Sequence, residues 1–145
     1  MNNRLWICPA MLILFATIIS TCTGGKTGIQ IEAAWARPAV EGANTAVYLS
    51  ITNLDSDDAW IEAESPQARM TELHRSIMQA DGTAKMEHQD QITLPQNVTV
   101  ELVSGGLHVM LIDLKQTLEP GDTVNLSLVF SQHERVNIDV PVKNP

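Results

Sequence analysis

The chain has 145 residues, of which 44% are hydrophobic and only 4% are aromatic. This length is enough for one hydrophobic core and too short for two ordinary domains. The 9 basic and 17 acidic side chains give a net charge of −8. Because an acidic surface repels phosphate backbones and anionic lipid headgroups, we expect no nucleic-acid partner.

The N-terminal residues are typical of an export signal. An apolar run over residues 5–19 follows Arg4, and it is shorter than the about 20 apolar residues of a bilayer-spanning helix. The Ile-Ser-Thr-Cys sequence ending at Cys22 resembles a bacterial lipobox, whose cysteine is lipidated and becomes the mature N-terminus. We therefore predict a lipoprotein signal peptide over 1–21 and a flexible tether over 22–28. Ordinary signal cleavage, with Cys22 incidental, is the alternative.

From residue 29 to residue 145 the pattern is one of short strands and turns. Within Thr45–Asn53, for example, Val47, Leu49 and Ile51 share one face. The expected strands are 29–35, 45–53, 59–64, 70–77, 85–88, 98–103, 107–114, 123–130 and 136–142. We find no amphipathic helix of ten or more residues. Eight or nine short strands of this kind predict a single all-β domain built as an antiparallel sandwich.

The cysteines narrow the chemistry open to this domain. Cys8 lies in the signal peptide and Cys22 would carry lipid, so the folded domain has no free thiol and no disulfide. A soft metal would therefore be bound by thioether and imidazole groups. A blue-copper electron-transfer site is excluded, because it needs a cysteine thiolate.

His108 and Met110 stand two residues apart on a predicted strand, directly after a Gly-Gly turn, so both leave the same face. Leu107, Val109 and Leu111 leave the opposite face, which is the expected core side. Ile112 and Leu114 share the His108 face by the same alternation, so that face is not simply solvated.

Partners for this pair are available on a neighbouring hairpin. A turn at Asp81-Gly82 would bring together the strands that carry His74 and Met86. Two imidazoles and two thioethers favour Cu(I) over zinc, calcium or magnesium. Taken singly, each methionine is more often core packing and each histidine an exposed or hydrogen-bonded residue. We keep those default interpretations for the other candidates, which are His88, His133, Met70 and Met78.

The spacing of these four residues resembles that of the periplasmic copper chaperone family PCuAC. In its signature a histidine with an optional adjacent methionine is followed by about ten residues, a methionine, 21 residues and His-x-Met. Here His74 and Arg75 precede the ten residues 76–85, then Met86, the 21 residues 87–107 and His108-Val109-Met110. Arg75 replaces the optional methionine.

The likeness extends over residues 33–142. Trp35-Ala36-Arg37-Pro38 resembles the opening of the family, and Tyr48 and Asn53 fall where its second strand carries them. The stretches 105–111 and 118–122 are similar to its most recognisable segments.

The resemblance implies a cupredoxin-like antiparallel β-sandwich with Greek-key topology, preceded by a signal peptide. It also implies one Cu(I) ion held by His74, Met86, His108 and Met110. The function it implies is delivery of copper in the bacterial periplasm, to a cytochrome c oxidase subunit or a Sco-type assembly factor. With the lipobox, the protein would be anchored to a membrane by lipid.

An enzyme is not expected, because the sequence has no nucleophile elbow, no glycine-rich phosphate loop and no recognisable pair of catalytic carboxylates. A metal-free structural or adhesive lipoprotein domain stays open as the alternative.

Overall fold

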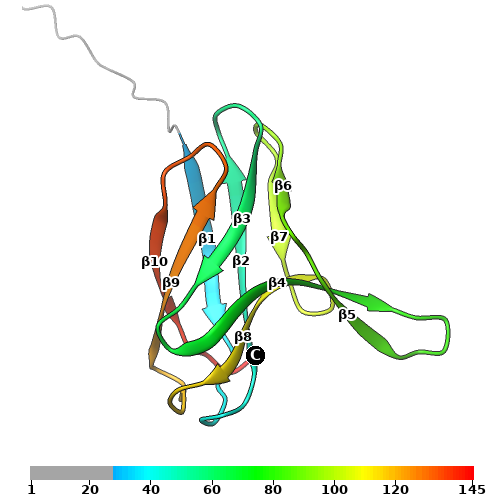
Figure 1. Ribbon diagram of the computed structural model, residues 1–145, viewed down its shortest axis with the longest axis vertical. Helices are drawn as coiled ribbons and strands as arrows, with labels where there is room; N and C mark the ends of the chain where they lie inside the picture. Colours follow the sequence, from blue (N-terminus) through cyan, green and yellow to red (C-terminus); the bar gives the residue numbers. More distant parts are fainter. Residues whose placement is uncertain (1–27) are drawn as a thin grey trace, which may run out of the picture.

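The computed structural model describes residues 28–145, which fold into two β-sheets packed face to face (Figure 1). The all-β sandwich predicted from the sequence is thereby confirmed. Ten strands make up the described part: β1 Ile29–Ala36, β2 Thr45–Asn53, β3 Asp58–Glu64, β4 Ala68–Met78, β5 Ala84–His88, β6 Ile92–Leu94, β7 Thr99–Leu102, β8 Leu107–Leu114, β9 Thr123–Phe130 and β10 Val136–Pro141. The predicted signal peptide, Cys22 and all of the predicted tether except Gly28 lie outside the described residues. Within 28–145 no helix is long and apolar enough to cross a bilayer.

The core lies between the sheets and consists mainly of aliphatic side chains. The predicted inward face of β2 is confirmed, since Val47, Leu49 and Ile51 are all at most 2% exposed. The largest core side chain is Trp60 on β3, which is fully buried. Its indole N–H donates to the Glu62 carbonyl at 2.8 Å, so its one polar atom is satisfied.

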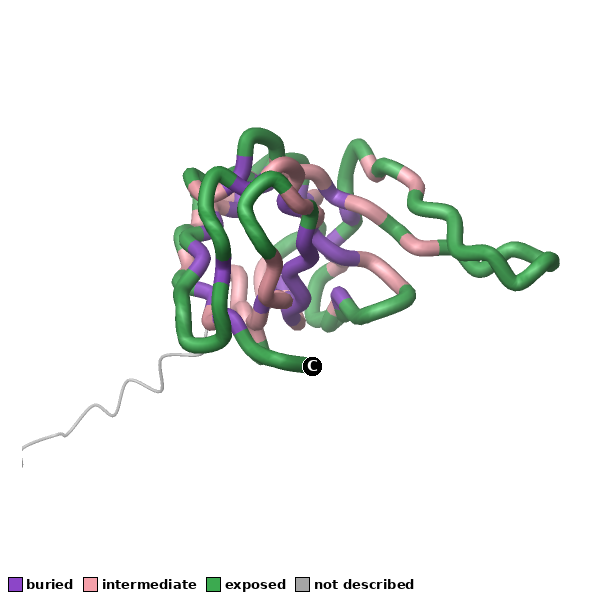
Figure 2. The backbone as a smooth tube through the Cα atoms, turned by 90° about the horizontal axis from the view of Figure 1, so that it is seen from below, coloured by how far each residue is buried: buried purple, intermediate pink, exposed green. Residues whose placement is uncertain are grey.

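The larger sheet has the order β1-β2-β7-β8-β4-β5, and β2 also pairs with β8. Residues Thr45–Val47 of β2 pair with β8, whereas Leu49–Thr52 pair with β7. Strands β7 and β8 thus follow one another along the same side of β2. The β4–β5 hairpin then projects beyond the body of the sandwich, and most of its residues are exposed (Figures 1 and 2).

Two local features differ from the prediction. The strand Ile92–Leu94 was not foreseen, because three residues with only Ile92 and Leu94 buried give too short an alternation to recognise. Leu114 was expected on the His108 face, but it is 1% exposed in the core. The reason is that Asp113, the residue before Leu114, has a left-handed backbone (φ 54°), which interrupts the alternation of β8.

Candidate metal centre

All four predicted ligand residues lie on the outer face of the six-stranded sheet. His74 on β4 and His108 on β8 are directly paired across the two strands, and their ring centroids are 5.9 Å apart. Met110 leaves the same face of β8 two residues after His108. Met86 on β5 is paired with Ser76, which shares the face of His74, so the hairpin brings Met86 diagonally next to His74. The register therefore gathers the set that the spacing predicted.

His108 is held in one orientation and one tautomer. Its Nδ1 lies 3.0 Å from the Gly106 carbonyl oxygen, which accepts only, so the ring proton is on Nδ1 and the lone pair is on Nε2. The side chain is only 3% exposed, and burial lowers the pKa of His108 more than the Gly106 bond raises it. The imidazole is therefore neutral at neutral pH, and its Nε2 is buried without a hydrogen-bond partner.

His74 shows the same arrangement with the nitrogens exchanged. Its Nε2 lies 2.7 Å from Glu72 Oε2, and because a carboxylate accepts, the proton is on Nε2 and the lone pair on Nδ1. That Nδ1 is also buried and unpartnered. Among the described residues, the buried side-chain nitrogen and oxygen atoms without a partner are these two and Arg37 Nε. A hydrogen-bonded second nitrogen is the usual arrangement of a metal-binding histidine.

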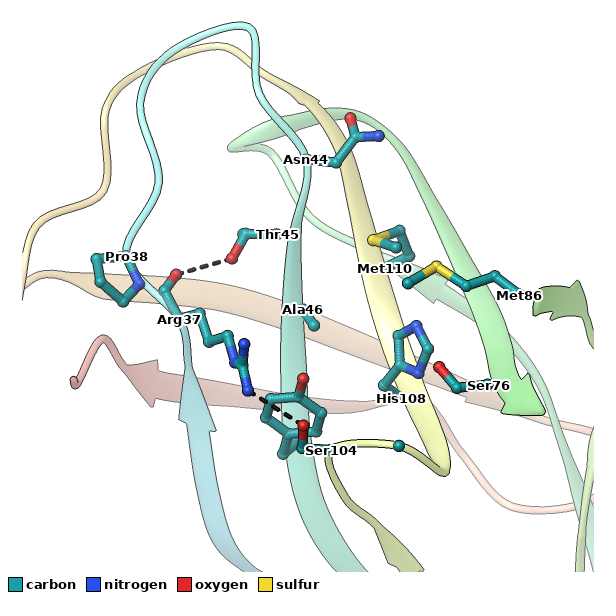
Figure 3. A pocket seen from close by; sticks show the side chains of 12 residues that line it. Arg37, Pro38, Asn44, Thr45, Ala46, Ser76, Met86, Ser104, His108 and Met110 are labelled. Atoms are coloured by element: carbon teal, nitrogen blue, oxygen red, sulfur yellow. Dashed lines mark hydrogen bonds between the residues drawn. The ribbon is translucent and has the colours of Figure 1, made fainter. Parts of the chain in front are cut away.

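The two methionines and His108 face a common pocket of about 550 Å³ (Figure 3). Met110 forms its wall from β8, and Met86, 53% exposed, reaches it from the projecting hairpin. His74 is not among the residues that line this pocket, although its ring centroid is 5.9 Å from that of His108.

The far wall of the pocket is built from packed rings and one hydrogen bond. Tyr48 packs against Trp35 with ring centroids 4.9 Å apart, and the Arg37 guanidinium lies 5.6 Å from the Tyr48 ring centroid. Arg37 also donates from Nη2 to Ser104 Oγ at 3.1 Å, which ties this wall to the turn that precedes His108 (Figure 3).

Sequence reasoning missed Glu72 on this face, and it kept His88, which it named as a candidate, as an exposed or hydrogen-bonded histidine. Together with His74 they place one ligand atom each within 4.8 Å of one another. A signal for both was present, because Glu72 stands two residues before His74 on the same strand face. In addition, a hairpin centred on Asp81 pairs His74 with His88.

The remaining candidates keep their default roles in the described structure. Met70 and Met78 are 51% and 70% exposed and do not line the pocket. His133 is hydrogen-bonded through Nδ1 to Asp58 at 2.6 Å and through Nε2 to Asp55 at 3.2 Å. It therefore fastens the loop after β9 to the start of β3.

The fold and the arrangement of these side chains place the chain among the PCuAC-type β-sandwich domains. The model of the LpqE-like family, described as "Putative lipoprotein LpqE-like", matches residues 29–142, and the chain belongs to this family. The resemblance inferred from the motif is thereby confirmed.

Individual relatives agree with this assignment. A Leifsonia xyli subsp. xyli protein described as "Putative lipoprotein Lxx21020" is 32% identical over 128 residues, which cover 86% of this chain and 76% of the relative. The solved structure of the copper-bound PCuAC domain from PmoF2 is 30% identical to this chain and superposes with a TM-score of 0.67. The match covers 83% of this chain and 97% of that domain. The Cu(I) form of DR1885 from Deinococcus radiodurans is also 30% identical, with 78% of both chains covered and a TM-score of 0.58.

Proposed function

We propose that this protein is a copper chaperone that binds one Cu(I) ion through His74, Met86, His108 and Met110. The observation that carries the proposal is the pair of buried imidazole lone pairs, His74 Nδ1 and His108 Nε2, that have no hydrogen-bond partner. A buried polar atom left without a partner costs about 1–3 kcal/mol. A bound cation would give both lone pairs a partner, and the thioethers of Met86 and Met110 line the pocket that His108 also lines.

The donor set favours a soft ion of low charge. Thioether sulfur is soft and neutral and imidazole is intermediate, a combination that selects Cu(I). Zinc would require thiolate or more histidine, and calcium would require oxygen. Because all four donors are neutral, the single positive charge of Cu(I) is left uncancelled. That favours release to a partner whose ligands are anionic.

The exposure of Met86 supports transfer. His108 is buried and fixed by Gly106, whereas Met86 is half-exposed on a hairpin that projects into solvent. A ligand of an approaching protein can displace Met86 first, while the histidines still hold the ion. Copper then passes by exchange of ligands and is never released as a free ion.

The finer parts of the proposal rest on the sequence and on the relatives. Two solved neighbours carry copper in their descriptions, and the family and the Leifsonia relative are described as lipoproteins. We propose a periplasmic, non-enzymatic protein anchored through a lipid on Cys22. We further propose that the ion goes to the copper centres of cytochrome c oxidase, directly or through a Sco-type assembly factor.

A competition titration against a chromophoric Cu(I) chelator tests the binding site. The wild-type protein should bind one equivalent, and His108→Ala and Met110→Ala should each weaken binding by at least about tenfold. Met70→Leu is the matched control, because it removes an exposed thioether outside the pocket. If the wild type binds no Cu(I), the protein is a metal-free structural or adhesive lipoprotein domain. If both alanine variants bind like the wild type, the ligands have been assigned wrongly.

Delivery and anchoring need separate experiments. Cu(I)-loaded protein is mixed with the metal-free soluble domain of an oxidase subunit or of a Sco-type factor, and the copper content of each is measured after separation. Copper that stays on the chaperone with both acceptors would contradict the proposed recipient. Cys22→Ala should abolish incorporation of radiolabelled palmitate in cells; incorporation that persists would contradict lipidation at this cysteine.

A further inference from the structure

Glu72, His74 and His88 form a group beside the proposed Cu(I) site, in which His74 is a ligand, Glu72 accepts the hydrogen bond from its Nε2 and His88 has no role. We propose that these three residues form a second site for a divalent ion of the Cu(II) or Zn(II) kind. We further propose that the two sites share His74 and so hold one ion at a time. The second site stands on its own geometry, whereas the sharing rests on the proposed Cu(I) function.

His74 lies midway between His108 of the Cu(I) site and His88 of the second site. On one side its ring centroid is 5.9 Å from that of His108, and on the other it is 6.0 Å from that of His88. The three rings form one row across β8, β4 and β5, because His74 is the direct register partner of both other histidines. Each nitrogen of His74 therefore has a different potential use.

The donor atoms of the second site are already close together. Glu72 Oε2 lies 2.7 Å from His74 Nε2 and 3.7 Å from His88 Nδ1, and the three ligand atoms are within 4.8 Å of one another. Metal–ligand bonds of about 2.0–2.2 Å bring tetrahedral donors to about 3.3 Å from each other. Small changes in side-chain rotamers are enough to reach that geometry.

Each ring nitrogen of His88 has a carboxylate near it. Its Nε2 lies 3.6 Å from Asp90 Oδ1, while its Nδ1 lies 3.7 Å from Glu72 Oε2. Glu72, His88 and Asp90 also line a pocket of about 260 Å³ that is separate from the first and gives water or ligand access to further coordination positions.

The charge of the donors separates the two sites chemically. The Cu(I) set is neutral, whereas Glu72 contributes a negative charge that a divalent ion needs more than a monovalent one. Imidazole and carboxylate suit Cu(II) and Zn(II), and the Irving–Williams order makes Cu(II) the tighter of the two. No thioether is present in this set, so it has no preference for Cu(I).

The proton of His74 makes the two sites exclusive. With Nε2–H donated to Glu72, the lone pair of Nδ1 is free for Cu(I). For Nε2 to bind a divalent ion, the proton must move to Nδ1, which then has no lone pair to offer. A neutral His74 can thus bind a metal through only one nitrogen at a time.

The test uses the mature chain and two series of titrations, one with Cu(I) and one with Cu(II) and Zn(II) separately. His88→Ala should weaken both divalent ions by at least about tenfold and leave Cu(I) affinity unchanged. His108→Ala should do the reverse. Glu87→Gln is the matched control, because it changes an acidic residue of the same strand whose side chain leaves the opposite face. Thermal unfolding checks that each variant is folded.

Two further measurements test which residues bind the divalent ion and how many ions are bound. Nitrogen couplings in the electron paramagnetic resonance spectrum of bound Cu(II) should fall from two imidazoles in the wild type to one in His88→Ala. Native mass spectrometry of wild type supplied with Cu(I) and Zn(II) should show one ion per chain. Two ions bound together would refute the claim that the two sites hold one ion at a time.

The outcomes separate this proposal from the previous one. If His88→Ala binds Cu(II) and Zn(II) as the wild type does, the ions sit on ordinary exposed acidic groups and the second site is wrong, whatever the Cu(I) result. If the wild type binds no Cu(I) while His88→Ala still loses the divalent ions, the proposed function fails and the second site stands.

Discussion

Replacing His108 by leucine distinguishes a metal-binding histidine from a structural one, because the two roles predict opposite changes in the stability of the metal-free protein. A structural histidine supports the fold through satisfied hydrogen bonds, so its loss destabilises. A histidine kept for a metal carries a polar atom that the fold alone does not satisfy. His108 Nε2 is buried without a partner in the described structure, so the proposed metal-binding role predicts the second behaviour.

The magnitude follows from the contacts of the two ring nitrogens. Removing Nδ1 loses one hydrogen bond to the Gly106 carbonyl, worth about 0.5–1.5 kcal/mol. That carbonyl also accepts from the Ser76 N–H at 3.0 Å, so it is not left unpaired. Removing the unsatisfied Nε2 recovers about 1–3 kcal/mol. We therefore expect metal-free His108→Leu to be about 1 kcal/mol more stable than wild type, which corresponds to a rise of about 4 °C in Tm.

Urea denaturation in the presence of a strong copper chelator measures this difference. Leu111→Ala is the reference, because it truncates a fully buried side chain of the same strand and should cost about 2–5 kcal/mol. Adding Cu(I) at 100 times the wild-type Kd should stabilise wild type by about 2.7 kcal/mol, and it should stabilise His108→Leu, whose Kd is at least about tenfold higher, by at most about 1.4 kcal/mol. A metal-free His108→Leu that is destabilised by more than about 1 kcal/mol would show that Nε2 is satisfied in solution, and the reasoning would fail.

Three further outcomes are expected. Burial raises the pKa of Asp58, but hydrogen bonds from His133 and from three backbone N–H groups have the larger combined effect, so the pKa of Asp58 is lowered. The hydrogen bond to Asp58 in turn raises the pKa of His133. The Asp58 contribution to stability is thus present above about pH 4 and lost as pH falls through its lowered pKa. The His133 contribution is present below about pH 6.5 and lost as pH rises through its raised pKa. In Asp58→Asn the urea midpoint should change less with pH than in wild type, both in the acidic range and above about pH 6.5. A pH dependence like that of wild type would show that the Asp58–His133 contact does not contribute to stability. Met86→Leu should weaken Cu(I) in the chelator competition, whereas Met78→Leu, on the same hairpin but outside the pocket, should not; equal losses would mean that the hairpin acts non-specifically. Gly105→Ala should lower the free energy of unfolding in urea by about 1–2 kcal/mol, because φ is +82°, a left-handed backbone that alanine rarely adopts. The added Cβ would meet no atom within 4 Å, so the backbone strain is the whole cost. No loss would mean that the turn adopts another conformation.

Most of the fold was predictable because alternation and turn residues repeat many times along the chain. Nine of the ten described strands were placed from such patterns, and the inward face of β2 was identified residue by residue. What failed was local. The left-handed backbone of Asp113 moved Leu114 from one face to the other, and nothing in the alternation signals where a strand is interrupted in this way.

The candidate metal site was predictable as a set of residues but not as an environment. Spacing brought His74, Met86, His108 and Met110 to the outer face of the sheet, but it did not show how far that face is covered. His108 proved to be 3% exposed, with the Tyr48 and His74 ring centroids 6.4 and 5.9 Å from its own. Alternation says which face a side chain leaves from; only tertiary structure says what covers that face, which nitrogen is hydrogen-bonded and which is free.

The division of the donors between two parts of the sheet explains how one surface could both hold and release an ion. His108 and Met110 come from β8, which pairs with β2 and β4 and has its inner face in the core. Met86 and His88 come from β5, an edge strand paired with β4 alone, on a hairpin whose side chains are mostly exposed. Elements with few buried contacts open at lower free energy than the core. Each donor set therefore combines a residue from the firmly held part of the sheet with one from the hairpin, and only the hairpin residue has to leave for the coordination shell to open. Since β5 supplies Met86 to one set and His88 to the other, a partner that engages the hairpin would act on both sites through the same strand.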